Sequence, residues 1–327
     1  MWGAQQFAKV ATATTANGLP DIKTGFTAAE RQLVASRIIA KCDALDGVAD
    51  GMVQDIKACQ ANFNLSADLP TCSGNVRDGT CLTTAQKEAI GNVFSGARNS
   101  AGTALYASFP YDAGVSGAGW AAWKQSNSIT LDPAAAAFTF TTPPQSASLL
   151  SQLSSYALNF SMDTDAPKIF ATSGAYTESS WSFMTPPDEA NLSALRQRGA
   201  KLMVYHGTSD PVFSSNDTTD WYQRVMAANG GDASSFARLF TVAGMNHCSG
   251  GPAADQFDML TPMVAWVEQG KAPDNVIATA RDASNAIPNS EVPAQWGAGR
   301  TRPLCPYPKV ARYKGGDVNS ATSFSCS

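Results

Sequence analysis

The sequence of 327 residues has little of what several classes of protein require. It contains only two histidines, His206 and His247, and none of its seven cysteines stands in a C-x-x-C pair, so a zinc site has poor support. No apolar stretch reaches the roughly 18 residues that a membrane-spanning helix needs. Lysine and arginine are scattered and the net charge is -4, which argues against nucleic acid or an anionic membrane as a partner. The first residues lack the basic-then-apolar pattern of a signal peptide.

Two apolar segments each break into a glycine-containing loop that carries a chemically useful side chain. Residues 201–210 read KLMVYHGTSD and end on Asp210, and residues 237–247 read ARLFTVAGMNH and end on His247. The segment between them has the pattern of a helix. An acid and then a histidine, each just past a strand, is the order in which an α/β-hydrolase presents the last two members of its triad. In this interpretation His247 is the general base and Asp210 stabilises its imidazolium.

The serine of such a triad is not evident. No segment matches G-x-S-x-G, and the nearest, residues 114–118 (GVSGA), lies in a glycine-rich loop with no strand before it. A plain structural role for Asp210 and His247 stays open at this point. Metal-dependent hydrolysis at His206 and His247 is a weaker alternative, because no clear carboxylate partner accompanies them.

With 44% hydrophobic residues, the chain has enough apolar material for one large domain or two. Capping signals at Thr27 and Thr83 predict two helices in the N-terminal part, and residues 99–190 look irregular and rich in loops. After a boundary near residues 186–191, strands and helices alternate, which predicts a parallel sheet covered by helices. We expect helices at 192–198, 218–228 and from Thr261–Pro262 to Gln269, and strands at 201–205, 237–242 and 276–281.

Three carboxylates fall within eight residues in the segment DALDGVADGM. Asp43, Asp46 and Asp50 stand among glycines that favour tight turns, and the backbone carbonyls of Val48 and Met52 could add further oxygens. Calcium takes roughly six to eight oxygen ligands, so the segment predicts a calcium site. It is not the EF-hand pattern, because the second acid falls one position late. A pair of Asx turns without metal is the alternative.

The seven cysteines invite three local disulfides and leave one residue over. The spacing suggests the pairs Cys42 with Cys59, Cys72 with Cys81, and Cys305 with Cys326, which suits an oxidising compartment. Seven reduced thiols are the alternative. The odd one, Cys248, directly follows His247, and we expect that its partner is missing from the chain.

Aromatic residues accompany the candidate site. His206 and Phe213 flank Asp210, while Trp120, Trp123, Phe138 and Phe140 lie in the irregular region. Aromatic side chains most often pack in a core. Beside a hydrolase site they could instead line a cleft for a flat substrate.

Five stretches together resemble one family: KCDALDGVADGMV, CLTTAQ, YHGTSDPVF, GMNHCSGG and RPLCPYPKVARYKG. They look like the tannase and feruloyl esterase family of α/β-hydrolases, and the similarity covers nearly the whole chain. The resemblance implies a hydrolase core into which a large, mostly helical and loop-rich lid is inserted. Residues 1–188 would be most of this lid and residues 189–327 the C-terminal half of the core.

The resemblance also assigns roles to residues. Asp210 and His247 match the acid and histidine of the family's triad. The family's lid calcium ligands fall on Asp43, Asp46, Val48, Asp50 and Met52, and we expect Trp123, Phe140, His206 and Phe213 to bind substrate. In the family a disulfide joins the residue before the catalytic serine to the residue after the histidine, so the partner of Cys248 is expected upstream. We therefore expect Met1 to be an internal or mis-called start, and a signal peptide to precede it in a secreted or periplasmic protein.

One departure concerns the substrate. In one member of the family, the stretch between the residues that match Trp123 and Phe140 is longer and carries an arginine that grips a free carboxylate. Here the only basic residue of that stretch is Lys124. A lysine is not an equivalent replacement for a bidentate arginine. We expect a serine-type carboxylesterase acting on small esters of aromatic acids, such as feruloyl, galloyl or terephthalate esters. This chain alone would be inactive. A catalytically silent, calcium-stabilised binding module is the alternative.

Overall fold

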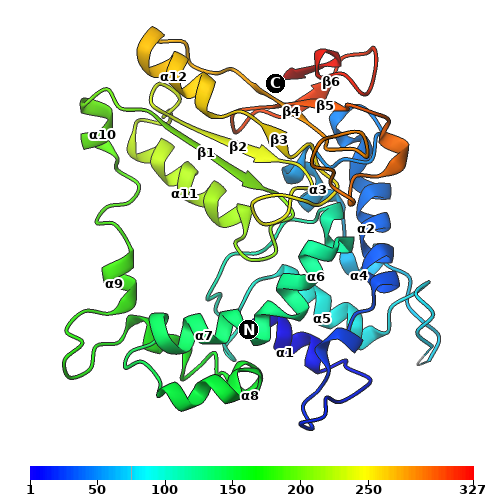
Figure 1. Ribbon diagram of the computed structural model, residues 1–327, viewed down its shortest axis with the longest axis vertical. Helices are drawn as coiled ribbons and strands as arrows, with labels where there is room; N and C mark the ends of the chain where they lie inside the picture. Colours follow the sequence, from blue (N-terminus) through cyan, green and yellow to red (C-terminus); the bar gives the residue numbers. More distant parts are fainter. Residues whose placement is uncertain (75) are drawn as a thin grey trace. The chain divides into compact units, whose positions relative to one another are not determined.

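The computed structural model describes residues 1–74 and 76–327 (Figure 1) and divides into two compact units, each assembled from separate stretches of chain. Unit 1 comprises Met1–Arg31, Leu65–Phe109 and Ala121–Glu189. Unit 2 comprises Gln32–Asn64, Pro110–Trp120 and Ala190–Ser327. Among the residues that are described, no helix is long and apolar enough to cross a membrane.

Unit 1 is built from short helices. In helix α5 (Thr84–Phe94) the Thr83 hydroxyl accepts from the Gln86 N–H and the Gln86 side chain accepts from the Thr83 N–H, so the predicted capping box is present. The region 99–190, which looked irregular in sequence, forms several helical turns whose shortness explains the absence of a clear period. The other helices that lie in this unit, wholly or for most of their length, are α1 (Trp2–Ala8), α4 (Leu65–Asp68), α6 (Ala118–Gln125), α7 (Leu131–Ala135), the π-helix η5 (Ala136–Phe140), α8 (Leu153–Asn159) and α9 (Ser180–Met184).

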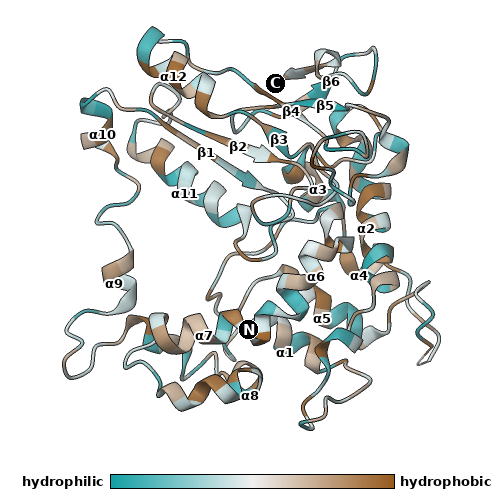
Figure 2. Cartoon of the chain, in the orientation of Figure 1, coloured by the Kyte–Doolittle hydropathy of each residue, from teal (hydrophilic) through white to brown (hydrophobic). Residues whose placement is uncertain are grey.

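In unit 2, two strands form a parallel pair. Strand β1 (Leu202–Gly207) runs beside β2 (Ala237–Val242), with Leu202 opposite Ala237 and Gly207 opposite Val242. Helix α11 (Ser215–Ala228) connects them. Hydrophobic and hydrophilic residues alternate along this helix (Figure 2), and its buried Tyr222 and Val225 pack with Leu239 of β2. This β–α–β unit confirms the prediction for residues 201–242.

The remaining strands are antiparallel. Strands β3 (Gln256–Phe257), β4 (Val276–Thr279) and β5 (Thr301–Leu304) form one sheet, and β6 (Ala311–Tyr313) pairs with β7 (Phe324–Cys326). The prediction that residues 276–281 join a parallel sheet is therefore wrong. In β4 buried and exposed residues alternate, with Ile277 51% exposed, which is typical of antiparallel strands rather than of parallel strands buried on both faces.

Besides α5, helices α2 (Ala28–Cys42), α10 (Ser193–Gln197), α11 and α12 (Leu260–Gln269) begin or end close to where the sequence predicted them. Helix α2 follows the capping signal at Thr27, and α10 precedes β1. Helix α3 (Ile56–Asn62) was not predicted. Helix α12 ends at Gly270 as expected but starts before Thr261, because the Asp258 side chain accepts the N–H groups of Leu260 and Thr261. Helix α11 likewise starts three residues early, after the cap at Ser214.

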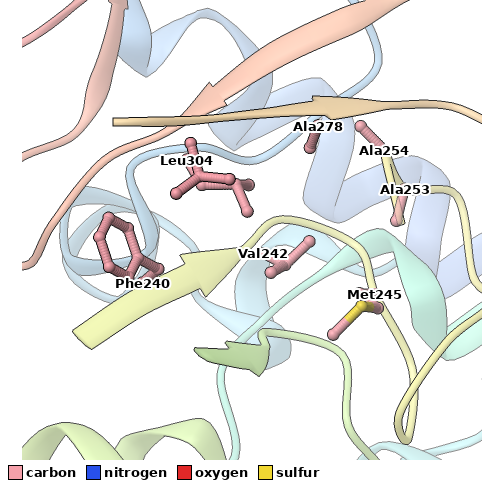
Figure 3. Packing of buried hydrophobic residues seen from close by; sticks show 8 residues of the cluster. Phe240, Val242, Met245, Ala253, Ala254, Ala278 and Leu304 are labelled. Atoms are coloured by element: carbon pink, nitrogen blue, oxygen red, sulfur yellow. The ribbon is translucent and has the colours of Figure 1, made fainter. Parts of the chain in front are cut away.

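A buried apolar cluster supports the loop that follows β2 (Figure 3). Phe240 and Val242 of β2 pack with Ala278 of β4 and Leu304 of β5. Met245 and the pair Ala253–Ala254 belong to the same cluster, so both ends of the loop containing His247 are fixed in the core.

The compact units do not coincide with the domains expected at residues 1–188 and 189–327. The last border, between Glu189 and Ala190, lies where the composition changes. Residues 32–64 and 110–120, however, belong to unit 2. Residues 32–64 group with the C-terminal part because two ion pairs join them to it, Asp50 with Arg302 and Asp55 with Arg312. The assignment of the N-terminal part to a lid stays a prediction.

Candidate active site

The parallel pairing of β1 and β2 brings the two candidate catalytic loops to the same edge of the sheet. Gly207 and Val242 are opposite each other at the ends of the strands. Beyond them the Thr208 N–H donates to Val242 O at 3.0 Å and the Ser209 N–H donates to Met245 O at 3.1 Å. A Cβ on Gly207 would lie 2.2 Å from Met245 O, so glycine permits this close approach.

Asp210 and His247 are in hydrogen-bond contact. His247 Nδ1 lies 2.9 Å from Asp210 Oδ2, and His206 Nε2 lies 3.3 Å from the same oxygen. The other oxygen, Oδ1, accepts the backbone N–H groups of Val212 at 2.8 Å and Phe213 at 3.0 Å. Asp210 is 6% exposed. Both oxygens of the buried carboxylate therefore face donors.

Two opposing effects act on the pKa of Asp210. Burial favours the neutral acid, but the hydrogen bonds from His206, His247, Val212 and Phe213 outweigh it and hold the pKa below its usual value. Asp210 is therefore a carboxylate at neutral pH and can only accept. It follows that His247 carries its proton on Nδ1, which leaves Nε2 as the basic nitrogen of the neutral ring. His206 correspondingly donates from Nε2, and its Nδ1 lies 2.8 Å from the hydroxyl of Thr218.

The predicted substrate-binding residues divide between the two units. Phe213 lies in unit 2, where its ring packs edge-on against His247 at 5.6 Å between centroids while 57% of the residue stays exposed. His206 contacts Asp210, as described above. Trp123 on α6 and Phe140 at the end of η5 belong to unit 1. Their part in substrate binding stays a prediction.

The segment nearest to a serine motif has no nucleophile geometry. Residues Ala113–Ser116 form a 3₁₀ turn, and the Ser116 hydroxyl donates to Ala113 O at 3.0 Å. Within residues 1–74 and 76–327 no strand leads into this turn. The same segment contains a residue that the sequence did not single out, Asp112, whose carboxylate contacts Thr208 and the Gly244 N–H. Its partners are distant in sequence, so no local pattern could reveal it.

The loop from Asp43 to Met52 is folded around its carboxylates. Asp43 accepts the backbone N–H groups of Asp50, Gly51 and Met52, and Asp46 Oδ1 accepts the Val48 N–H at 3.2 Å. Asp50 pairs with Arg302 of β5. Asp46 Oδ2 and Asp50 Oδ1 are buried and have no hydrogen-bond partner among the described residues.

Burial raises the pKa of Asp46 to about 7, and it raises the pKa of Asp43 as well; the neighbouring carboxylate of Asp50 adds to both shifts. Two orphaned, buried carboxylate oxygens fit a cation. However, the part of the chain that the structure describes has no group of three or more His, Cys, Asp or Glu side chains arranged to hold a metal ion. The loop is therefore not a complete metal site as it stands. The calcium set Asp43, Asp46, Val48, Asp50 and Met52 stays a prediction.

Six cysteines are paired in the structure. The disulfides join Cys42 to Cys59, Cys72 to Cys81 and Cys305 to Cys326. Cys248 is a free, exposed thiol and has a φ of 64°. The first disulfide joins the residues on either side of the loop from Asp43 to Met52.

Comparisons with known proteins identify the family of the chain. The family described as "Tannase and feruloyl esterase" matches residues 1–327. Mono(2-hydroxyethyl) terephthalate hydrolase of Piscinibacter sakaiensis is 42% identical over 99% of this chain, and a probable feruloyl esterase of Arthroderma benhamiae is 33% identical over 88%. The chain spans only about half the length of these relatives, 56% and 50% respectively.

Solved structures lead to the same fold. Feruloyl esterase B from Aspergillus oryzae superposes with a TM-score of 0.66 at 25% identity, covering 100% of this chain and 60% of that one. A second esterase from the same organism gives a TM-score of 0.70 at 22% identity, which supports the fold alone. This is the mixed helix and sheet fold of these esterases. The chain belongs to the tannase and feruloyl esterase family.

Proposed function

We propose that this chain provides the acid and the histidine of a serine-type carboxylesterase acting on esters of aromatic acids. The observation that carries the proposal is the contact of 2.9 Å between His247 Nδ1 and the ionised, buried Asp210. A histidine oriented in this way through Nδ1 presents Nε2 as a base, which is the arrangement that activates a serine hydroxyl.

The chain's own residues have defined parts in this mechanism. His247 takes the proton of the serine hydroxyl on Nε2 as the serine attacks the ester carbonyl, and returns it to the leaving alcohol. Asp210 stays ionised and stabilises the imidazolium. His206 and the backbone N–H groups of Val212 and Phe213 hold the Asp210 carboxylate in place. In the second half-reaction His247 acts in the same way on water.

The sequence has no G-x-S-x-G segment, and Ser116, in the nearest match, lies in a 3₁₀ turn. We therefore propose that the nucleophile and the oxyanion-hole donors are supplied from outside this sequence. The coverage of only about half of each relative is consistent with this proposal.

The substrate class follows from aromatic residues and from the relatives. Phe213 presents an exposed ring beside His247. Trp123 and Phe140 are also proposed to bind substrate, as the family resemblance implies. The relatives are named for terephthalate and feruloyl esters. Lys124, whose ammonium lies 3.9 Å from the centre of the Phe109 ring, is a point charge and does not replace a bidentate arginine. We propose a small ester of an aromatic acid that needs no carboxylate clamp.

Calcium is proposed as a structural ion of the loop from Asp43 to Met52. Asp46 Oδ2 and Asp50 Oδ1 would contribute the carboxylate oxygens that now have no partner, and Val48 and Met52 their carbonyls. A bound divalent ion supplies positive charge that offsets the burial of the carboxylates. Three disulfides support a secreted or periplasmic location.

The test is reconstitution. The 327-residue chain is produced alone and together with the N-terminal half of a related esterase, and hydrolysis of a p-nitrophenyl ester and of methyl ferulate is measured. The chain alone should hydrolyse no faster than a control protein. The combined halves should show turnover that depends on a serine of the added half. Folded, combined halves that bind an aromatic ester without hydrolysing it would instead favour a silent binding module.

A further inference from the structure

Asp112 lies where three segments of unit 2 meet. It is 2% exposed and caps the 3₁₀ turn Ala113–Ser116, with its carboxylate 3.4 Å from the Gly114 N–H. Oδ2 accepts the hydroxyl of Thr208 and, at 3.1 Å, the backbone N–H of Gly244. One carboxylate oxygen thus receives a donor from the loop after β1 and a donor from the loop after β2.

These two donors are close in sequence to the candidate catalytic residues. Thr208 stands two residues before Asp210, and Gly244 stands three residues before His247. Thr208 Oγ1 also lies 3.0 Å from the Gly244 N–H, so the three groups form a closed set of contacts. The turn that follows Asp112 also contacts the loop after β1, because the Gly114 N–H donates to Ser209 Oγ at 3.1 Å. A Cβ on Gly114 would lie 2.4 Å from the Ser209 side chain, so glycine allows the turn to approach this loop.

Asp112 has no cationic partner among the described residues, which it shares with Asp43 and Asp46, whereas three other acids of unit 2 have one. Asp50, Asp55 and Asp255 each pair with an arginine. In the described part of the chain Asp112 has only hydroxyl and N–H partners, and burial raises its pKa despite them. A buried carboxylate without a cation is costly for folding. We therefore look for the role of Asp112 in the segments that its carboxylate joins.

We propose that Asp112 is a positioning residue that ties the loop after β1 to the loop after β2 and thereby keeps His247 Nδ1 in contact with Asp210. Asp112 touches neither side chain and acts through Thr208 and Gly244. The relevance of the tie for catalysis rests on the proposed function, but the tie itself does not.

The two histidines of the chain make this testable by NMR of the imidazole protons in the full 327-residue protein. Wild type should show a slowly exchanging Nδ1–H of His247. In Asp112→Asn the carboxamide places an NH₂ donor against the existing donors, and exchange of this proton should accelerate about tenfold or more. The Nε2–H of His206 is an internal reference, because its contacts with Asp210 and Thr218 do not cross between the two loops.

Two further variants make the result decisive. Asp55→Asn removes a buried carboxylate that caps α3 and pairs with Arg312 but has no hydrogen bond of its own to either loop, and it should leave the His247 proton unchanged. Thr208→Val removes the hydroxyl that donates to Asp112 and accepts from Gly244, but keeps the direct contact between Asp112 and the Gly244 N–H, and it should give a smaller, selective acceleration. It decides the question if Asp112→Asn does not fold.

Selective acceleration at His247 in Asp112→Asn, or in Thr208→Val where only that variant folds, supports the proposal. Unchanged exchange in the folded variants, equal acceleration at both histidines, or the same selective effect in Asp55→Asn overturns it. Ester hydrolysis plays no part in this readout. The proposal can therefore fail while the proposed function stands, and the reverse.

Discussion

The site around Asp210 and the loop from Asp43 to Met52 both bury carboxylates, and they satisfy them in opposite ways. Each oxygen of Asp210 faces donors from its own unit, and the pKa of Asp210 is lowered. In the loop, Asp46 Oδ2 and Asp50 Oδ1 face no donor from the residues that the structure describes, and burial raises the pKa of Asp46 to about 7. The first arrangement holds a negative charge ready to stabilise an imidazolium. The second gains most from an added cation.

The largest expected effect is a difference in kcat between variants of the two histidines at the site around Asp210. In the reconstituted esterase, His247→Ala should lower kcat by about a thousandfold or more, because no other group takes the serine proton. His206→Ala removes only one of four donors to Asp210 and should cost about tenfold. Comparable losses in the two variants, measured under saturating substrate, would contradict the assignment of His247 as the base.

The second region should respond to calcium. At about one hundred times the dissociation constant, a ligand of the native state adds about 2.7 kcal/mol, which corresponds to a rise in Tm of roughly 4 °C for a chain of 327 residues. Asp46→Ala should abolish this rise. Asp55→Asn, a buried acid outside the loop, should retain it. Melting curves that do not change with calcium or with a chelator would favour plain Asx turns.

Acid should distinguish Asp210 from Asp112. The native pKa of Asp210 is lowered, so its stabilising contribution is present above the unfolded value of about 3.9 and is lost as pH falls through the native pKa. The pKa of Asp112 is raised, so its ionisation costs stability as pH rises from the unfolded value through the native pKa.

The denaturant midpoints of Asp210→Asn and Asp112→Asn, each compared with wild type, should therefore change with pH in opposite directions. Asp210→Asn should be less stable than wild type at neutral pH, and this difference should shrink as pH falls through the native pKa of Asp210. The stability of Asp112→Asn relative to wild type should instead increase as pH rises. Parallel curves for the two variants would mean that the environments of the two acids do not differ as described.

The smallest effect concerns Phe213. Contact of its exposed ring with an aromatic substrate would be worth about 0.5–1.5 kcal/mol, so Phe213→Ala should raise KM for an aromatic ester about two- to tenfold with little change in kcat. Phe213→Leu is the matched control for apolar bulk. An unchanged KM for the aromatic ester in Phe213→Ala would remove this residue from the substrate site.

Local signals in the sequence predicted local structure well. Strand β2 has the predicted bounds of 237–242, and the Thr83 capping box opens α5. The start of α12 was missed because the Asp258 side chain, rather than Thr261, supplies the cap. The direction of β4 was missed because pairing with β5, more than twenty residues on, is not encoded in the strand itself.

The same distinction holds for the candidate site. Asp210 and His247 could be predicted as candidates because each follows a recognisable strand. Asp112 could not, because its contact with Thr208 spans 96 positions of the sequence. The grouping of residues 32–64 with the C-terminal part depends on ion pairs such as Asp50 with Arg302, at a separation of 252.

The most direct test of the central claim is to locate the nucleophile with a fluorophosphonate, which labels an activated serine. The 327-residue chain alone should take up no label, whereas the reconstituted esterase should be labelled at one serine of the added half. His247→Ala should abolish that labelling. Peptide mapping by mass spectrometry gives the position. Stoichiometric, His247-dependent labelling of a serine within these 327 residues would contradict the account.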